Sequence, residues 1–296
     1  MSKPIAILLV IFTMWSCGVI RNRGSEKYLP GPAIRDDYTP KGIVQEVQYP
    51  GSVPGPTCRR MIVYLPANYY SSGRRYPVIY LLHGARGYET SWIRKGQVYQ
   101  STDSLWQEGL AEPCIIVMPN MNQYNDDSDY EGGRYKDAWE SIFEVDGTVE
   151  YAFVHDVVNL VDSLYHTIPD KSHRAIAGLS IGGYQSIFLA VNHPDIFGYI
   201  GSFSPYTWCL GRSHGYRKLF YGHLYRKMAS LYANPPLGFY LYAGKWDIMR
   251  PSTQRIHYRM NRKGYTHYYT LYPGSHDWHN GWIEEFQDML KKVFKK

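Results

Sequence analysis

The chain has 296 residues, 44% hydrophobic and 20% charged, so it can build a sizeable core and is not a disordered protein. The formal net charge is +6, and because Lys and Arg are spread along the chain, nucleic acid is not expected as a partner. Aromatic residues are frequent at 16%, with 29 Tyr and 8 Trp. Such side chains offer flat apolar faces that suit a polar, partly planar ligand.

The N-terminus has the pattern of an export signal. Lys3 precedes an apolar run over residues 5–15, which is as long as the hydrophobic region of a signal peptide and shorter than the roughly 20 residues that span a bilayer. The run ends in Met-Trp-Ser-Cys-Gly, which resembles a bacterial lipobox with Cys17 as the lipidated residue. We therefore expect a lipoprotein-type signal peptide at residues 1–16 and a lipid-anchored protein in the bacterial cell envelope, periplasmic or at the outer membrane. An ordinary signal peptide or an uncleaved anchor is the alternative.

Residues 17–41 have the composition of a tether, with Gly, Pro and polar residues and little hydrophobic periodicity. Three further cysteines, Cys58, Cys114 and Cys209, allow at most one disulfide, whose pairing the sequence does not determine. The chain has no CxxC motif or Cys/His cluster, so a structural zinc site is not expected.

From residue 42 to 296, short apolar runs alternate with helical patterns, which predicts one α/β domain with a mostly parallel eight-stranded sheet and helices on both faces. The predicted strands are residues 43–49, 60–65, 78–82, 115–118, 174–178, 199–203, 239–243 and 268–272. The predicted helices are residues 151–165, 181–192, 252–263 and 283–294. In the first helix, the residues expected to face the sheet are Phe153, Val157, Leu160, Val161 and Leu164. Residues 120–147 and 206–236 follow strands and are expected to form loops that contact a ligand.

The central motif is Gly-Leu-Ser-Ile-Gly around Ser180, placed between a predicted strand and a predicted helix. In this G-x-S-x-G pattern the serine occupies a sharp turn above the sheet, and Gly178 and Gly182 leave room for close backbone packing. The helix that follows directs its N-terminal N–H groups and positive dipole end toward the reacting oxygen. Ser180 is therefore the predicted nucleophile.

A serine turn of this kind predicts the chain order Ser, then acid, then His. Of the later aspartates, Asp247 directly follows the predicted strand 239–243, whereas the alternatives Asp195, Asp277 and Asp288 lie in a turn, beside a histidine and in the last helix. His276 follows the next strand and is the predicted base, with His279 as runner-up. His257 and His267 occupy ordinary helical and pre-strand positions. His276 and His279 lack the further ligands that a metal site requires.

An oxyanion hole needs two backbone N–H groups directed at the developing negative charge. One is expected from Ile181, directly after the nucleophile, and the other from the His-Gly turn after the third strand. In that turn Ala85 is the predicted donor and Arg86 the alternative. His83 is expected to be structural, with its ring holding the loop.

The segments YLLHGARG, IIVMPN, RAIAGLSIGGYQS, HPDIFG, GSFSP and PGSHDW, in this order, resemble the putative-esterase family of α/β-hydrolases. That family includes feruloyl and acetyl-xylan esterases, S-formylglutathione hydrolase, enterochelin esterase and mycolyltransferases. The resemblance extends from about residue 42 to the C-terminus. It implies an α/β-hydrolase fold, the triad Ser180, Asp247 and His276, oxyanion donors Ala85 and Ile181, and ester hydrolysis through an acyl-enzyme without metal or cofactor.

The expected substrate class is acylated carbohydrate, such as feruloyl or acetyl esters of plant polysaccharide. Several side chains in loops at the expected catalytic edge are candidate substrate contacts, namely Arg86, Tyr88, Trp92, Tyr206, Trp208, Trp246 and Trp278. Aromatic packing that only stiffens these loops is the alternative. An acyltransferase of the mycolyltransferase type, a serine peptidase of the same fold and a noncatalytic carbohydrate-binding relative are the competing functions. No obligate protein partner is implied.

Overall fold

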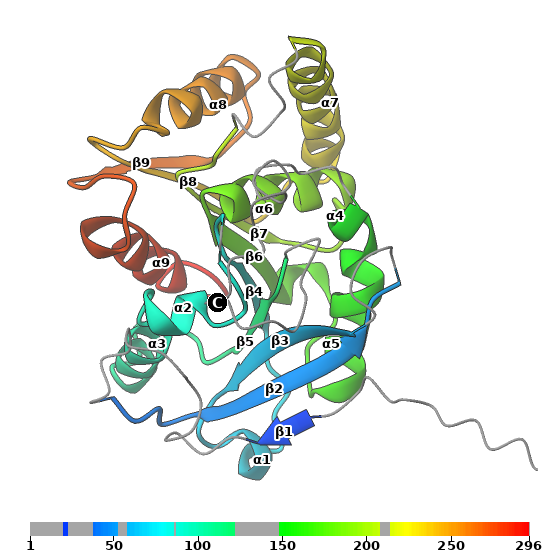
Figure 1. Ribbon diagram of the computed structural model, residues 1–296, viewed down its shortest axis with the longest axis vertical. Coiled ribbons are helices and arrows are strands. Elements are labelled where there is room, and N and C mark those ends of the chain that lie inside the picture. The colour runs from blue at the N-terminus through cyan, green and yellow to red at the C-terminus, as the bar shows by residue number, and fades with distance from the viewer. Residues whose placement is uncertain are drawn as a thin grey trace, which may run out of the picture.

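A twisted β-sheet runs through the middle of the molecule (Figure 1). The computed structural model describes residues 20–22, 38–52, 58–85, 87–121, 148–207 and 214–295. Within these residues the sheet has nine strands in the order β1-β2-β3-β5-β4-β6-β7-β8-β9. The strands are β1 Ile20–Asn22, β2 Ile43–Pro50, β3 Cys58–Leu65, β4 Val78–Leu82, β5 Ile115–Pro119, β6 Arg174–Leu179, β7 Tyr199–Phe203, β8 Gly238–Gly244 and β9 Tyr268–Tyr272.

The type of strand pairing changes once across the sheet, at β5. β1, β2, β3 and β5 pair antiparallel in turn, whereas β5, β4, β6, β7, β8 and β9 run parallel to one another. Strands β4 to β8 are buried at every position, as their continuous apolar sequences predict for a parallel sheet covered on both faces. Because these strands are parallel, the loops that follow β4, β6, β8 and β9 meet at one edge of the sheet.

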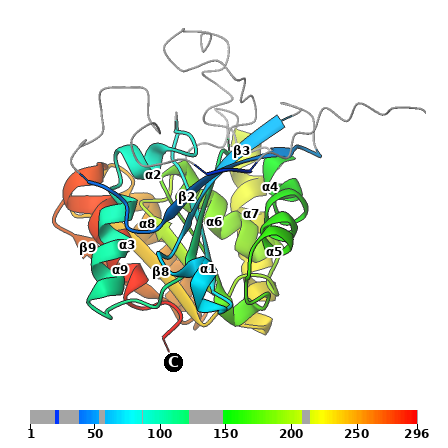
Figure 2. The same ribbon diagram turned by 90° about the horizontal axis from the view of Figure 1, so that it is seen from below.

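Helices cover both faces of the sheet. Their bounds are α1 Tyr69–Ser72, α2 Ser91–Arg94, α3 Val98–Gln107, α4 Thr148–Phe153, α5 Asn159–Leu164, α6 Ile181–Asn192, α7 His214–Ala233, α8 Arg250–Arg262 and α9 Ile283–Leu290. Side chains of α4 to α8 form one core layer, and side chains of α2, α3 and α9 form the other. Figure 2 shows α3 and α9 on one side of the strands and α4 and α5 on the opposite side.

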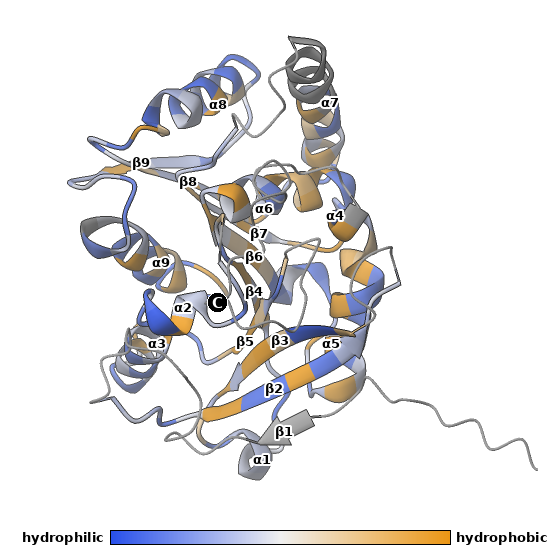
Figure 3. Cartoon of the chain, viewed as in Figure 1, coloured by the Kyte–Doolittle hydropathy of each residue, from blue (hydrophilic) through white to orange (hydrophobic). Residues whose placement is uncertain are grey.

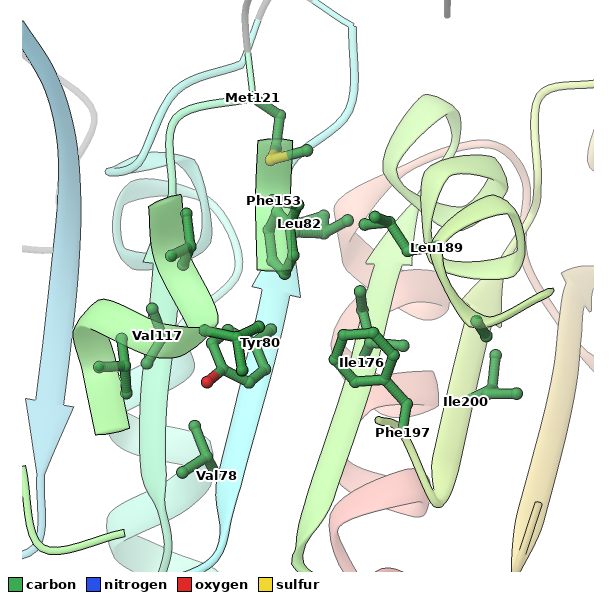
Figure 4. Packing of buried hydrophobic residues seen from close by; sticks show 14 of the residues in the cluster. Val78, Tyr80, Leu82, Val117, Met121, Phe153, Ile176, Leu189, Phe197 and Ile200 are labelled. Carbon is green, nitrogen blue, oxygen red and sulfur yellow. The ribbon is translucent and has the colours of Figure 1, made fainter. Parts of the chain in front are cut away.

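Hydrophobic residues concentrate on the central strands, where the core lies (Figure 3). Tyr80 of β4 contacts Phe153 and Phe197 edge to face, with ring centroids 5.6 and 6.0 Å apart. Ile176 of β6 and Leu82 of β4 lie in the same layer (Figure 4). Aromatic and aliphatic packing of this density fixes the strands, and therefore the loops at their ends.

The predicted α/β fold is confirmed, and all eight predicted strands are present. The ninth strand, β1, lies within residues 17–41, so this part of the expected tether is bound to the sheet through β2. Residues 1–19 and 23–37 lie outside the described residues, so the expected signal peptide stays a prediction. None of the described helices has the length and hydropathy of a bilayer span.

The first predicted helix is interrupted by a π-helical turn at Val154–Val158, between α4 and α5. Phe153, Val157 and Val161 are buried as expected, but Leu164 is 39% exposed. A π-helical turn inserts one extra residue, which rotates the following helix by about 100° relative to a regular α-helix. The expectation for Leu164 is therefore wrong because the periodicity changes within the helix.

Candidate active site

Ser180 occupies a sharp turn between β6 and α6. β6 ends at Leu179, α6 begins at Ile181, and Ser180 between them has φ 54° and ψ −115°. A positive φ strains a residue other than glycine, so surrounding contacts must hold it. The Ser180 N–H donates to the Phe203 carbonyl at 2.8 Å, and the Ser180 carbonyl accepts from the Tyr206 N–H at 2.9 Å. Both ends of the strained residue are therefore fixed to the segment around the end of β7.

Two glycines allow this turn to close against the end of β4. A Cβ at Gly182 would lie 2.3 Å from the His83 carbonyl oxygen, and a Cβ at Gly178 would lie 2.6 Å from the Gly182 backbone. Both distances are well inside van der Waals contact, so any larger side chain would push the segments apart. The prediction that these glycines permit close packing is confirmed.

Three side chains from the loops after β6, β8 and β9 form a hydrogen-bonded row. His276 Nε2 lies 3.1 Å from Ser180 Oγ, and His276 Nδ1 lies 3.0 and 3.1 Å from the two carboxylate oxygens of Asp247. Because an ionised carboxylate only accepts hydrogen bonds, Nδ1 carries the ring proton and Nε2 can accept the proton of the serine hydroxyl. Ser180 and Asp247 are only 8% and 4% exposed, so solvent screens this row weakly.

Asp247 is held in its ionised form. Burial raises the pKa of this carboxyl, but hydrogen bonding with His276, the charge of His276, the nearby Ser204 side chain and the Met249 N–H together lower the pKa below its ordinary value. The Met249 N–H donates to Oδ1 at 2.6 Å. A carboxylate that stays negative can keep accepting the Nδ1 hydrogen bond and so holds the imidazole in one orientation.

The other candidates have different partners. The remaining aspartates accept hydrogen bonds elsewhere: Asp195 from Asn234, Asp277 from the Trp278 N–H and Asp288 from Tyr242. His257 and His267 hydrogen-bond to each other at 2.8 Å, and His279 is exposed. Within the described residues, Asp247 and His276 are therefore the acid and histidine that the structure brings to Ser180.

The loop after β4 packs directly against Ser180. A Cβ at Gly84 would lie 3.4 Å from the Ser180 Cβ, so the next peptide, with the Ala85 N–H, lies in the immediate surroundings of the serine. The Ile181 N–H is the first of α6, and the first N–H groups of a helix have no partner within it. Among the described turns and loops, neither N–H donates to a backbone carbonyl. These two N–H groups are therefore suited to binding a negatively charged oxygen. Arg86, the alternative donor, lies outside the described residues.

The buried His83 ring holds this loop in place. Nδ1 lies 2.8 Å from the Gly84 carbonyl oxygen, and Nε2 accepts from the Met121 N–H at 2.9 Å. Burial lowers the pKa of His83 to about 4, although hydrogen bonds with Gly84 and Asn120 act in the opposite direction. His83 is therefore neutral at neutral pH and joins the loop to the end of β5, which confirms the expected structural role.

The aromatic candidates divide by exposure. Trp92 is 1% exposed, donates from Nε1 to the Leu82 carbonyl at 2.9 Å and packs against Phe203 and Phe286. The expectation that Trp92 contacts substrate is therefore wrong, because its ring is buried in the core. The remaining described candidates are accessible to solvent. Tyr88, Tyr206 and Trp278 are half-buried, and Trp246 is 66% exposed. The candidates Trp208 and Cys17 lie outside the described residues.

Three residues near the row were not singled out from the sequence. Ser204 directly follows β7, has φ 49° and is 1% exposed. The Trp282 ring meets the His276 ring edge to face at 4.8 Å. Glu285 is fully buried, and burial, together with repulsion from Asp247 and Glu284, raises its pKa well above the ordinary value. The position of Glu285 on the apolar face of α9, near Trp282 in sequence, is the signal that could have identified it.

Among the cysteines, Cys58 is disulfide-bonded and Cys114 is a buried free thiol. Burial raises the pKa of the Cys114 thiol, so it is not an activated nucleophile. Within the part of the chain that the structure describes, no group of three or more His, Cys, Asp or Glu side chains could hold a metal ion. The partner of Cys58 is not among the described residues.

Comparison with known proteins places this site in a family. A family model described as "Putative esterase" matches residues 56–293. An "Endo-1,4-beta-xylanase/feruloyl esterase" of Xylanibacter ruminicola is 33% identical over 150 residues, which make up 49% of this chain and 19% of that protein. The chain spans 19% to 58% of the length of four curated relatives that it matches.

Solved structures share the whole fold at low sequence identity. A ferulic acid esterase of Anaeromyces mucronatus has a TM-score of 0.70 at 20% identity, covering 92% of this chain and 96% of that one. An S-formylglutathione hydrolase of Staphylococcus aureus has a TM-score of 0.62 at 16% identity, covering 83% and 95%. These likenesses establish the α/β-hydrolase fold.

Proposed function

Because the chain belongs to the Putative esterase family, we propose that it is a serine esterase that cleaves carboxylic esters through an acyl-enzyme. The observation that carries this proposal is the row Asp247–His276–Ser180, joined by contacts of 3.0 and 3.1 Å. A serine hydroxyl is a weak nucleophile until an adjacent base accepts its proton. In this row Ser180 is the nucleophile, His276 the base and Asp247 the group that orients the base.

The first half-reaction transfers the acyl group to the enzyme. Ser180 Oγ forms a bond to the ester carbonyl carbon while His276 Nε2 accepts the hydroxyl proton. The carbonyl oxygen becomes negative and receives hydrogen bonds from the N–H groups of Ala85 and Ile181, each typically worth about 3 kcal/mol. The tetrahedral intermediate then loses the alcohol, which leaves with the proton from His276.

The second half-reaction returns the enzyme to its starting state. Water attacks the acyl carbon as His276 Nε2 accepts one of its protons, and the same N–H groups stabilise the second tetrahedral intermediate. Ser180 Oγ leaves with the proton from His276, and the carboxylic acid is released. Asp247 keeps its negative charge throughout and stabilises the imidazolium in both steps. This sequence uses no metal and no organic cofactor.

For the substrate, we propose acylated carbohydrate, with feruloyl or acetyl esters of plant polysaccharide as the class. The xylanase/feruloyl esterase relative at 33% identity supports this choice. The exposed Trp246, which precedes Asp247, and the half-buried Tyr206 and Trp278 support it further, because flat apolar faces stack on sugar or aromatic acyl rings. An acyltransferase would use the same acyl-enzyme and pass the group to a sugar hydroxyl instead of water.

A substrate panel tests the proposal. Purified enzyme is assayed with p-nitrophenyl acetate, methyl ferulate, acetylated xylan and a peptide p-nitroanilide, and product is measured with and without a sugar acceptor. We expect ester hydrolysis, including release of ferulate or acetate, and no amide cleavage. Ser180→Ala must abolish the activity. Ester hydrolysis that survives this substitution would refute the nucleophile, and acyl-sugar product in place of free acid would indicate the transferase.

Residence in the cell envelope is a separate proposal. It is supported by the apolar run at residues 5–15 and the Cys17 motif in the sequence. When the full-length protein is produced in a bacterium fed with labelled palmitate, we expect label on the wild type and none on Cys17→Ser. Equal label on both proteins would contradict a lipid anchor at this cysteine.

A further inference from the structure

Glu89 is a buried carboxylate in the loop that carries the proposed oxyanion donor Ala85. It is 7% exposed, and one of its oxygens accepts a hydrogen bond from Asn120 Nδ2 at 2.8 Å. The other oxygen lies 3.3 Å from Nε of Arg60 on β3. A buried carboxylate is tolerated only where partners compensate its desolvation, so these contacts hold Glu89 in one place.

The segment at the end of β5 holds this loop at two points. Asn120 binds Glu89, and the next residue, Met121, donates its N–H to His83 Nε2 at 2.9 Å. Asn120 is itself fixed, because its N–H donates to the Arg60 carbonyl at 2.9 Å. Ala85 lies between the two points, His83 and Glu89. The position of the loop over Ser180 is thus tied to the ends of β3 and β5.

We propose that Glu89 is a positioning residue for the oxyanion hole: by binding Asn120 it fixes the loop that carries the Ala85 N–H. This inference rests on the proposed esterase function. Glu89 does not touch the reacting atoms, and its effect passes through the loop backbone. Oxyanion donors act through their fixed positions, and a misplacement of about 1 Å at a catalytic group can lower the rate by about 100-fold.

Two substitutions of Glu89 distinguish its contact with Asn120 from its contact with Arg60. Gln at this position keeps an oxygen that can accept from Asn120 but loses the charge that faces Arg60, whereas Ala loses both. If the hydrogen bond to Asn120 is what matters, Glu89→Gln retains the loop position and Glu89→Ala does not. Asn120→Ala removes the same hydrogen bond from the other side, together with the contact between Asn120 and His83. Adding Glu89→Ala to Asn120→Ala must therefore cause little further loss.

The experiment compares Glu89→Ala, Glu89→Gln, Asn120→Ala and the double variant Glu89→Ala/Asn120→Ala with wild type. Glu112→Ala is the matched control, because Glu112 also pairs with an arginine, Arg74, at 2.9 Å, but on the surface. Activity toward p-nitrophenyl acetate is expressed per site labelled with a fluorophosphonate, so that unfolded protein is not counted. Affinity for phenylboronic acid is measured in parallel, because its tetrahedral adduct with a serine hydroxyl places an oxygen in the oxyanion hole.

We expect Glu89→Ala and Asn120→Ala to lower kcat by about 10- to 100-fold with little change in KM, and to weaken phenylboronic acid binding by a similar factor. Glu89→Gln should recover most of the loss, and Glu112→Ala should match wild type. A kcat per labelled site within twofold of wild type in both Glu89→Ala and Asn120→Ala would overturn the inference. An increase in KM with kcat unchanged would overturn it as well. Failure of the esterase proposal is recognised separately, because wild type itself would then not hydrolyse the esters or Ser180→Ala would remain active.

Discussion

Gly182 provides a direct test of how the turn at Ser180 supports the chemistry. Its replacement by Ala adds a carbon that would lie 2.3 Å from the His83 carbonyl oxygen and 2.8 Å from the Leu82 carbonyl oxygen. Since Cβ contacts under 3.0 Å are essentially never seen, the two segments must separate by about 0.7 Å. Both neighbours are backbone atoms, so the loop after β4 has to move as a unit and carry Ala85 with it.

We expect Gly182→Ala to lower kcat by more than partial unfolding of the protein would explain. A displacement of this size at an oxyanion donor is expected to lower kcat by about 100-fold, with a small change in KM. Overpacking of a closely packed site is expected to lower the free energy of unfolding by about 1–3 kcal/mol. The assay is kcat and KM with p-nitrophenyl acetate, together with urea unfolding of the same preparations.

Gly198 supplies the matched control. A Cβ there would also lie 2.3 Å from a backbone oxygen, that of Lys171, but Gly198 precedes β7 and so lies at the opposite end of the strands from Ser180. Gly198→Ala should therefore lose comparable stability and keep its kcat. If Gly182→Ala and Gly198→Ala had the same kcat, the link between this close contact and the oxyanion loop would be refuted.

Three further predictions concern single side chains. Asp247→Asn should lower kcat by about 10⁴-fold, because an amide lets His276 adopt the wrong tautomer; steady-state rates at pH 8 within tenfold of wild type would contradict this role. Burial raises the pKa of Glu285 in the folded state. The stability that this group contributes is therefore complete below about pH 4.5. As the pH rises from there toward the folded-state pKa, the free energy of unfolding falls by up to about 1.4 kcal/mol per pH unit. Glu285→Gln should thus gain stability relative to wild type between pH 5 and pH 8 in urea unfolding, and a constant difference would argue against a buried neutral acid. Trp246→Ala should raise KM by roughly 2- to 10-fold for a feruloylated oligosaccharide and leave KM for p-nitrophenyl acetate unchanged, whereas equal effects on both would exclude stacking on the sugar.

Much of this architecture can be predicted from local sequence. Ser180 and Asp247 each follow a continuous apolar run, which is typical of strands buried in a parallel sheet, whereas His276 follows the Tyr-rich edge strand β9. Because the carboxyl ends of parallel strands meet at one edge, chain order and strand ends together indicate which polar residues become neighbours. The strand bounds match for β4, β7 and β9, where apolar residues stop abruptly at Gly, Pro, Ser or His.

What the sequence could not predict depends on contacts between distant segments. Trp92 follows a glycine-containing loop, and nothing local distinguishes a ring that faces solvent from one that faces α9 and β7. The Glu89–Asn120 hydrogen bond joins residues 31 positions apart. The sequence pattern does not reveal the helix α7. Its many Tyr, Lys and Arg residues are compatible with either a buried or an exposed face, and they obscure the helical spacing of the apolar residues Leu224, Met228 and Leu231.

The backbone at the catalytic edge limits how the enzyme can be stabilised. Ser180 and Ser204 directly follow the neighbouring strands β6 and β7, and both have φ near +50° although neither is glycine. Such conformations are unfavourable by about 1–3 kcal/mol each and persist because the surrounding structure holds them. Glycine would relieve the strain, but at Ser180 it would also remove the proposed nucleophile. Efforts to obtain a more heat-resistant enzyme are therefore better directed to the helices on the sheet faces, where added stability does not compete with catalysis.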